Sequence, residues 1–143
     1  MLRIMLAVVC LSISSPPASP DISGRWNVVI PEETQKNPNG GTSNWKEVRG
    51  TLDVAQKSSD LRATWRTLDE WTLTGRIDVE GRFTLESEER QIPATRDGRK
   101  ESVPARWIVR GALKDGTLSG LAALAIGDRE PIFHKWHATK GTF

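Results

Sequence analysis

Cysteine is nearly absent from this chain of 143 residues, which contains one, Cys10. A single cysteine excludes an intramolecular disulfide, and Cys10 lies in an N-terminal segment that we expect to be removed. The mature chain must therefore be held by packing alone, and its core must be extensive.

Histidine is also scarce, and neither sign of charge is in clear excess. His134 and His137 are the only histidines, and three positions apart on a strand they would point to opposite faces and could not share a metal ion. Without Arg3 of the leader, 19 basic residues stand against 18 acidic ones and no basic block stands out. The sequence therefore gives no indication of a metal, a cofactor, nucleic acid or an anionic membrane as a partner.

The first 18 residues are typical of a secretory signal peptide. Arg3 gives a basic start, residues 4–11 form an uncharged apolar run, and small residues with two prolines follow. This run is too short to span a bilayer in the mature protein. Cleavage after Ser14 and cleavage after Ala18 both fit the pattern. We expect an exported protein, periplasmic or secreted, with one domain over residues 19–143.

Beyond the leader there is no helical period, and apolar and polar residues alternate with a period of two. This pattern predicts antiparallel strands near 22–30, 45–56, 59–66, 70–78, 82–88, 103–114, 117–126 and 129–140. About eight strands connected in a meander fit a closed up-and-down β-barrel, whose interior holds packed side chains or one small ligand. We therefore predict an all-β fold with two long loops, 31–44 and 89–102, at one rim.

Three turn signals predict the register of this barrel. The expected pairs are Lys114 with Thr117 around Asp115 and Gly116, Ile77 with Phe83 around a turn ending at Gly81, and Val54 with Leu61 around Lys57 and Ser58. All three turns keep the apolar residues of both strands on the inner face of the sheet. A slip by one residue would turn these apolar residues outward.

The alternation also predicts which side chains point inward. They are Trp26, Val28, Ile30, Val48, Leu52, Val54, Leu61, Ala63, Trp65, Trp71, Leu73, Ile77, Phe83, Leu85, Ala105, Trp107, Val109, Leu113, Leu118, Ala122, Leu124, Ile126, Ile132, His134 and Trp136. On the outer face, Ile108 and Ala123 are expected cross-strand partners with Leu121 nearby. That small apolar patch is compatible with a monomer or a weak dimer.

Residues 22–26, Ile-Ser-Gly-Arg-Trp, resemble the first-strand signature of the calycin superfamily of lipocalins and avidins. Residues 136–140 are similar to a Trp-x-Ala-Thr-basic run of avidins. The resemblance implies a ligand-binding barrel in which a basic residue of the last strand, here Lys140, packs over the first-strand tryptophan, Trp26. Avidin sites use tyrosine, and the absence of tyrosine argues against biotin as the ligand.

A weaker resemblance links the same opening to small periplasmic barrels that inhibit secreted metalloproteases. In those proteins an N-terminal arm inhibits the protease, and the corresponding segment here is 15–21, rich in proline and serine. The resemblance implies a protein partner rather than a small ligand.

No combination of residues indicates a reaction, so we do not expect an enzyme. One hypothesis is a carrier of a small apolar ligand that enters between loops 31–44 and 89–102. The expected ligand-binding residues are Trp65, Trp71, Trp107 and His134, because their parity places them inside the barrel near the loop-covered end. The other hypothesis is a protein-binding module, either inhibitor-like or a structural component of the cell envelope, with a barrel filled by its own side chains.

Overall fold

The computed structural model describes residues 18–36 and 40–141, and every regular element in these ranges is a strand. The strands are β1 (Gly24–Ile30), β2 (Glu33–Lys36), β3 (Thr42–Trp45), β4 (Val48–Lys57), β5 (Asp60–Arg66), β6 (Glu70–Ile77), β7 (Arg82–Ser87), β8 (Arg90–Arg96), β9 (Arg99–Lys114), β10 (Thr117–Ile126) and β11 (His134–Lys140). The expected signal peptide, except for Ala18, lies outside the described residues.

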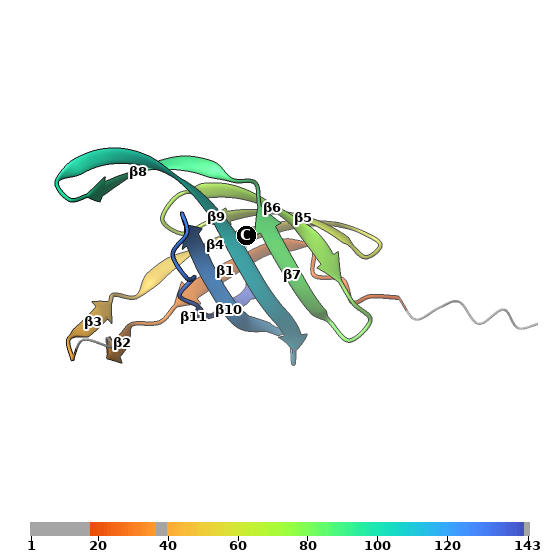
Figure 1. The fold of residues 1–143 in the computed structure, drawn as a ribbon. Coiled ribbons are helices and arrows are strands. Elements are labelled where there is room, and N and C mark those ends of the chain that lie inside the picture. Colours follow the sequence, from red (N-terminus) through yellow and green to blue (C-terminus); the bar gives the residue numbers. More distant parts are fainter. Residues whose placement is uncertain (1–17, 37–39, 142–143) are drawn as a thin grey trace, which may run out of the picture.

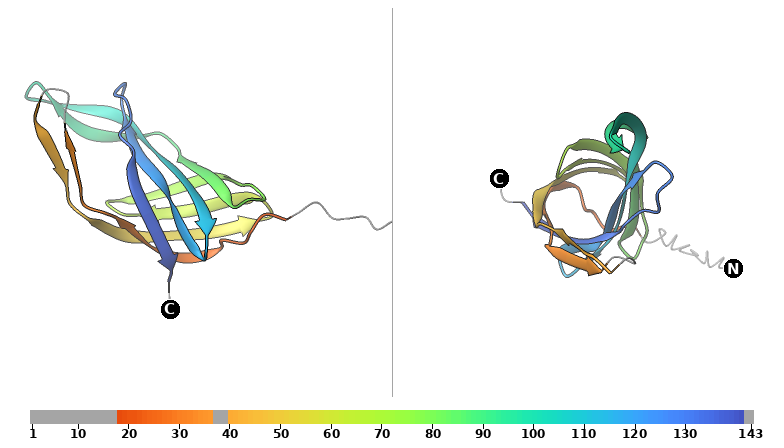
Figure 2. Two further views of the ribbon diagram at one scale, coloured as in Figure 1. Left: turned by 90° about the horizontal axis from the view of Figure 1, so that it is seen from below. Right: turned by 60° about the vertical axis from the view of Figure 1, so that its left-hand side comes forward.

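Eight of these strands close into a barrel (Figure 1). The order around the wall is β1, β4, β5, β6, β7, β9, β10 and β11, and β11 pairs again with β1. Every pairing is antiparallel and joins strands that are consecutive around the meander. The ring is visible end-on in the right-hand view of Figure 2. The predicted all-β up-and-down barrel is confirmed.

Two of the three predicted turns are confirmed. Asp115 and Gly116 both have positive φ, as a two-residue hairpin turn requires, and Lys114 pairs with Thr117. Ile77 pairs with Phe83 as expected.

The prediction for the turn between β4 and β5 is wrong by one position. Lys57 pairs with Asp60 around Ser58, which has a φ of 58°, so Val54 pairs with Ala63 instead of Leu61. Moving a turn by one residue shifts each cross-strand partner by two. The same side chains then stay inside, so the hydrophobic phase does not distinguish the two registers.

The expected long loops are also wrong, because each contains a hairpin. β2 pairs with β3 within 31–44, and β8 pairs with the first part of β9 within 89–102. We call these hairpins the β2–β3 arm and the β8–β9 arm. Both project from the same end of the barrel (Figure 2). A signal for the second arm is present in the sequence, since Asp97 and Gly98 repeat the Asp-Gly turn and both have positive φ.

The last strand is shorter than predicted, beginning at His134 instead of 129. A turn in which Arg129 N–H donates to the Ile126 carbonyl at 3.2 Å follows β10, and Pro131 has no N–H to offer a ladder. Ile132, expected inside, is 48% exposed in this loop. The other predicted inward residues are buried or partly buried.

The outer-face patch is smaller than expected. Ile108 and Ala123 pair as predicted, but both are buried within the single chain, at 7% and 0% exposed, and Leu121 is left at 40%. Phe133 in the loop before β11 is also partly buried, with the Arg110 guanidinium 5.1 Å from its ring centre.

One end of the barrel, which we call the closed end, is sealed around Trp26. The Trp26 indole N–H donates to the Ile22 carbonyl at 2.8 Å, and Ile22 is fully buried. The Lys140 ammonium lies 4.8 Å from the Trp26 ring centre and donates to the Ser23 carbonyl, so the expected packing of Lys140 over Trp26 is confirmed. Gly24 has a φ of 114°, and a Cβ there would lie 2.8 Å from the Lys140 Nζ.

Replacing Trp26 by alanine is expected to lower the free energy of unfolding by about 3–5 kcal/mol, as for other large-to-small core substitutions. Lys140→Met keeps an aliphatic stem over the ring and removes the cation–π contact and the hydrogen bond to the Ser23 carbonyl, so its loss should be about 1–2 kcal/mol. Urea unfolding followed by circular dichroism measures both. Similar losses for the two variants would contradict a central role for the Trp26 ring.

Gly111 leaves room for two aromatic rings. A Cβ at this position would lie 2.6 Å from Phe83 Cζ and 2.8 Å from Trp136 Cζ2. Gly111→Ala should therefore destabilise the protein by about 1–3 kcal/mol through overpacking. Phe83→Leu removes the nearer contact, so in the double variant the cost of the alanine should fall. Additive losses in the double-mutant cycle would refute this explanation.

Candidate functional site

The candidate site is the end of the barrel from which the two arms project, which we call the mouth (Figure 2). Here β1, β5, β7 and β10 end, and β4, β6 and β11 begin. Four of the five apolar side chains that pack on the core while partly exposed lie at the mouth or on its arm: Val48, Ile92, Leu124 and Ile126. The fifth, Leu113, is near the closed end, so the apolar lining is most open at the mouth.

A groove of about 230 Å³ lies between the β8–β9 arm and the turn after β10. Ile92, Val103 and Ile126 contribute to its apolar lining, and charged side chains of both signs, including Arg96 and Asp128, line it as well. The groove is therefore apolar in part and polar in part.

Three of the four predicted ligand-binding residues come together. Trp65 on β5 and Trp71 on β6 are directly opposed cross-strand partners, and the ring centres of Trp65 and Trp107 are 5.7 Å apart. Trp136, expected inside but not in the predicted site, is also 5.7 Å from Trp65 in an edge-to-face contact. Trp65 is fully enclosed, so the tryptophans form a packed floor beneath the mouth.

His134 lies apart from these tryptophans. Its ring meets Trp45 edge-on at 5.0 Å between centres, and its Nδ1 is 3.4 Å from a carboxylate oxygen of Glu33 on the β2–β3 arm. The His134 side chain is 21% exposed. Glu33 and Trp45 were not predicted as neighbours of His134, because Glu33 was expected in the loop 31–44 and Trp45 at the start of the strand 45–56.

Two polar atoms in the site have no hydrogen-bond partner within the described residues. They are the indole nitrogen of Trp65 and the hydroxyl of Thr67, both enclosed, on β5 and just beyond its end. Ser87, in contrast, is fully used: its hydroxyl accepts from the Trp107 backbone N–H at 2.8 Å and donates to the Glu88 carbonyl at 3.0 Å. Thr67 and Ser87 were missed because alternation of apolar residues does not reveal buried hydroxyls.

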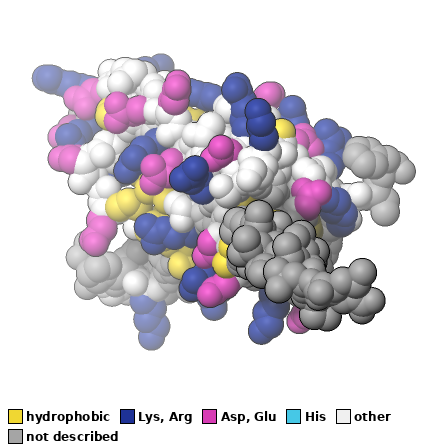
Figure 3. Space-filling model, turned by 90° about the vertical axis from the view of Figure 1, so that its right-hand side faces the viewer, with side chains coloured by type: hydrophobic (Ala, Val, Ile, Leu, Met, Phe, Trp, Pro, Cys, Tyr) yellow, Lys and Arg dark blue, Asp and Glu magenta, His cyan; other side chains and the backbone are white. Residues whose placement is uncertain are grey.

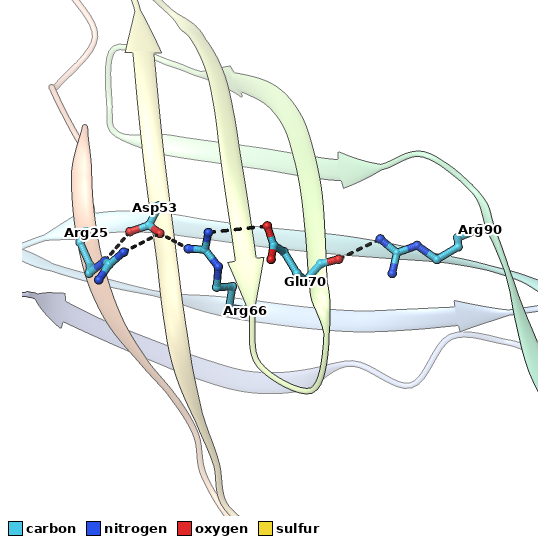
Figure 4. Close-up of polar contacts among 5 residues, drawn as sticks. All are labelled: Arg25, Asp53, Arg66, Glu70 and Arg90. Carbon is cyan, nitrogen blue, oxygen red and sulfur yellow. Dashed lines mark hydrogen bonds and ion pairs between the residues drawn. The ribbon is translucent and has the colours of Figure 1, made fainter.

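A ladder of charges crosses the outer wall and ends over Trp71 (Figure 4). Arg25 Nε lies 2.7 Å from Asp53, Arg66 bridges Asp53 and Glu70, and Arg90 donates to the Glu70 carbonyl at 2.8 Å. The Arg90 guanidinium stacks 3.8 Å from the Trp71 ring centre. The ladder therefore links strands β1, β4, β5 and β6 to the cation that covers Trp71.

The described part of the predicted inhibitory arm lies at the opposite end from the mouth. Ser19 Oγ donates to the Ile77 carbonyl at 3.0 Å, and Gln56 Nε2 donates to the Pro20 carbonyl at 2.9 Å. Residues 15–17 lie outside the described residues. Figure 3 shows the face of the molecule that lies on the right in Figure 1, where acidic and basic side chains are interspersed and hydrophobic side chains are visible only in small areas.

Over residues 18–36 and 40–141, no three side chains of His, Cys, Asp or Glu are grouped so that they would hold a metal ion. None of the described residues forms a helix long and apolar enough to cross a membrane.

No protein-family model, curated protein or solved structure matches the chain. The closed antiparallel barrel with Lys140 over Trp26 is compatible with a calycin-like fold.

The pKa of Asp53 is lowered from its ordinary value of 3.8, first by the hydrogen bond from Arg25 and further by Arg66. Because the pKa of this carboxyl group is lower in the folded state than in the unfolded chain, its ionised form stabilises the fold at pH values above the ordinary pKa. This stabilisation is lost as the pH falls through the lowered pKa. Asp53→Asn should therefore cost about 1 kcal/mol at neutral pH and progressively less in acid.

Thermal unfolding at pH 7 and pH 3 measures this difference. Asp60→Asn is the matched control, because Asp60 makes one ion pair, with Arg76 at 3.0 Å, and its side chain is 67% exposed. Its cost should be smaller than that of Asp53→Asn. A cost for Asp53→Asn that does not change with pH would contradict the electrostatic role of the ladder.

Proposed function

We propose that this protein is an exported, non-catalytic binding protein for a small apolar ligand that enters at the mouth. The observation that carries the proposal is the difference between the two ends of the barrel. Ile22, Trp26 and Lys140 seal the closed end, whereas Val48, Leu124 and Ile126 are left partly exposed at the mouth. Apolar side chains left open at one end of a barrel favour a ligand that covers them.

The tryptophans support a ligand that lies over them. Trp65 contacts both Trp107 and Trp136, so the lower part of the barrel is filled by its own side chains. Trp71 is covered by Arg90, which is exposed and is the first residue of β8 in the β8–β9 arm. A ligand between the arms would rest on Trp71, Trp107 and the enclosed Trp65, with His134 on another side of the mouth.

The titratable groups also favour binding over catalysis. The carboxyl groups with lowered pKa values are Asp21, Asp53 and Asp78, and their causes are hydrogen bonds on the outer surface. A catalytic acid or base needs a pKa matched to its task and a position inside a site.

Two measurements test the proposal on the mature protein, purified from the envelope of the cells that make it. They are native mass spectrometry and tryptophan fluorescence before and after delipidation. We expect a retained small molecule and a shift in tryptophan emission when it is removed. Ile126→Asp should lose the molecule because it places a charge in the apolar mouth. Val79→Asp is the control, since Val79 is 52% exposed in the turn between β6 and β7 at the closed end. A bare mass with unchanged fluorescence would refute the carrier.

A second candidate, a protein-binding module, is favoured by the β8–β9 arm. β8 lies at the end of the strand order, so one of its edges has no neighbouring strand. Such an edge is a template for an added strand from another protein. On this alternative the purified protein carries no small molecule, and chemical cross-links from Lys100 on the arm join it to one defined protein partner. Cross-links spread evenly over the surface lysines would contradict a docking role for the arm.

A further inference from the structure

The two unpaired polar atoms belong to residues two positions apart at the mouth end of β5, Trp65 on the strand and Thr67 just beyond it. Trp65 is 0% exposed, and neither its indole nitrogen nor the enclosed Thr67 hydroxyl has a partner within the described chain. A buried polar group without a partner is unfavourable and uncommon in folded proteins, so each instance calls for an explanation.

Other polar groups in the interior do have partners. The indole N–H of Trp26 donates to the Ile22 carbonyl at 2.8 Å, and that of Trp136 donates to the Arg110 carbonyl at 3.1 Å. The Ser87 hydroxyl makes two hydrogen bonds. The missing partner therefore distinguishes the Trp65 indole from those of Trp26 and Trp136.

The interior also lacks charge where it is described. Among the buried side chains of the described residues, Ser87 is the one polar side chain, and none is charged. Arg90, the cation that covers Trp71, is already engaged, because it donates to the Glu70 carbonyl at 2.8 Å. An anionic or cationic ligand group placed here would be desolvated without a counter-ion, at high cost.

We propose that Trp65 and Thr67 bind an oxygen atom of a neutral, mainly apolar ligand, such as a ketone, an ester or an alcohol. This inference rests on the proposed function and names the ligand class of the same site. An indole N–H can only donate, so the ligand atom that meets Trp65 must be an acceptor. The Thr67 hydroxyl donates to the same oxygen, or accepts from it when the ligand is an alcohol.

The test uses three probes of equal chain length on the delipidated mature protein: 2-decanone, decane and decanoate. Isothermal titration calorimetry measures affinity, and tryptophan emission reports binding. We expect 2-decanone to bind about fivefold to tenfold more tightly than decane, the effect of one net hydrogen bond. Decanoate should bind weakly at pH 7 and more tightly below about pH 5, where its carboxyl group is protonated.

Two conservative variants locate the effect. Thr67→Val keeps the shape of the side chain and removes the hydroxyl, so it should weaken 2-decanone binding about fivefold and leave decane binding unchanged. Its ligand-free melting midpoint should not fall, because it removes a buried polar group that has no partner. Trp65→Phe removes the indole nitrogen together with part of the ring system, so its melting midpoint should fall and its preference for 2-decanone over decane should be lost. Thr64→Val on the outer face of β5 and Trp26→Phe at the closed end are the matched controls, and both should bind all probes as the unmodified protein does.

Each other result overturns the inference in a distinguishable way. Equal affinities for 2-decanone and decane would leave the binding function standing and remove the role of Trp65 and Thr67. Tightest binding of decanoate at pH 7 would show that the site takes an anion. Unchanged 2-decanone binding with a lower melting midpoint in Thr67→Val would mean that the two atoms hold only a structural water. Binding of no probe would remove the proposed function and this inference together.

Discussion

The contacts of Trp65 with Trp107 and Trp136 join strands that are not neighbours in the wall. Trp65 is on β5, Trp107 on β9 and Trp136 on β11, so the three rings tie together separate parts of the ring of strands. A chain without a disulfide depends on such packing, and each buried indole removes roughly 150–250 Å² from water. The backbone must leave space for these rings, which it does at Gly111, where a side chain would overlap Phe83 and Trp136.

The tryptophan cluster also divides the barrel into two unlike halves. Below it, Ile22, Trp26 and Lys140 complete a sealed end. Above it, apolar side chains remain partly exposed and the wall continues into two arms. The Trp65 nitrogen of the cluster itself and the Thr67 hydroxyl have no hydrogen-bond partner within the described residues. These features distinguish the mouth from the closed end in packing, polarity and accessibility together, and a binding site requires this combination.

Much of the barrel is predictable because one face of nearly every strand is apolar, and a period of two fixes which side chains point inward. The Asp-Gly turn at Asp115 fixes its hairpin fully, whereas the turn at Ser58 is displaced in a way that hydrophobic phase does not detect. The arms are harder to predict, because β2, β3 and most of β8 have polar residues on both faces.

The site is predicted only in part: Trp65, Trp71 and Trp107 meet, but the unpaired state of the Trp65 nitrogen depends on neighbours from distant strands. The placement of His134 beside Glu33 depends on an arm that alternation does not reveal.

β9 belongs to two structures at once. It runs without a break from Arg99 to Lys114, pairing first with β8 in the arm and then with β7 and β10 in the barrel. Trp107 lies on this strand just past the point where the arm joins the wall. No loop separates the two parts, so we expect a displacement of the arm to bend the strand that carries Trp107 and to change its contact with Trp65. A partner that binds the arm from outside would then alter the indole emission of this protein.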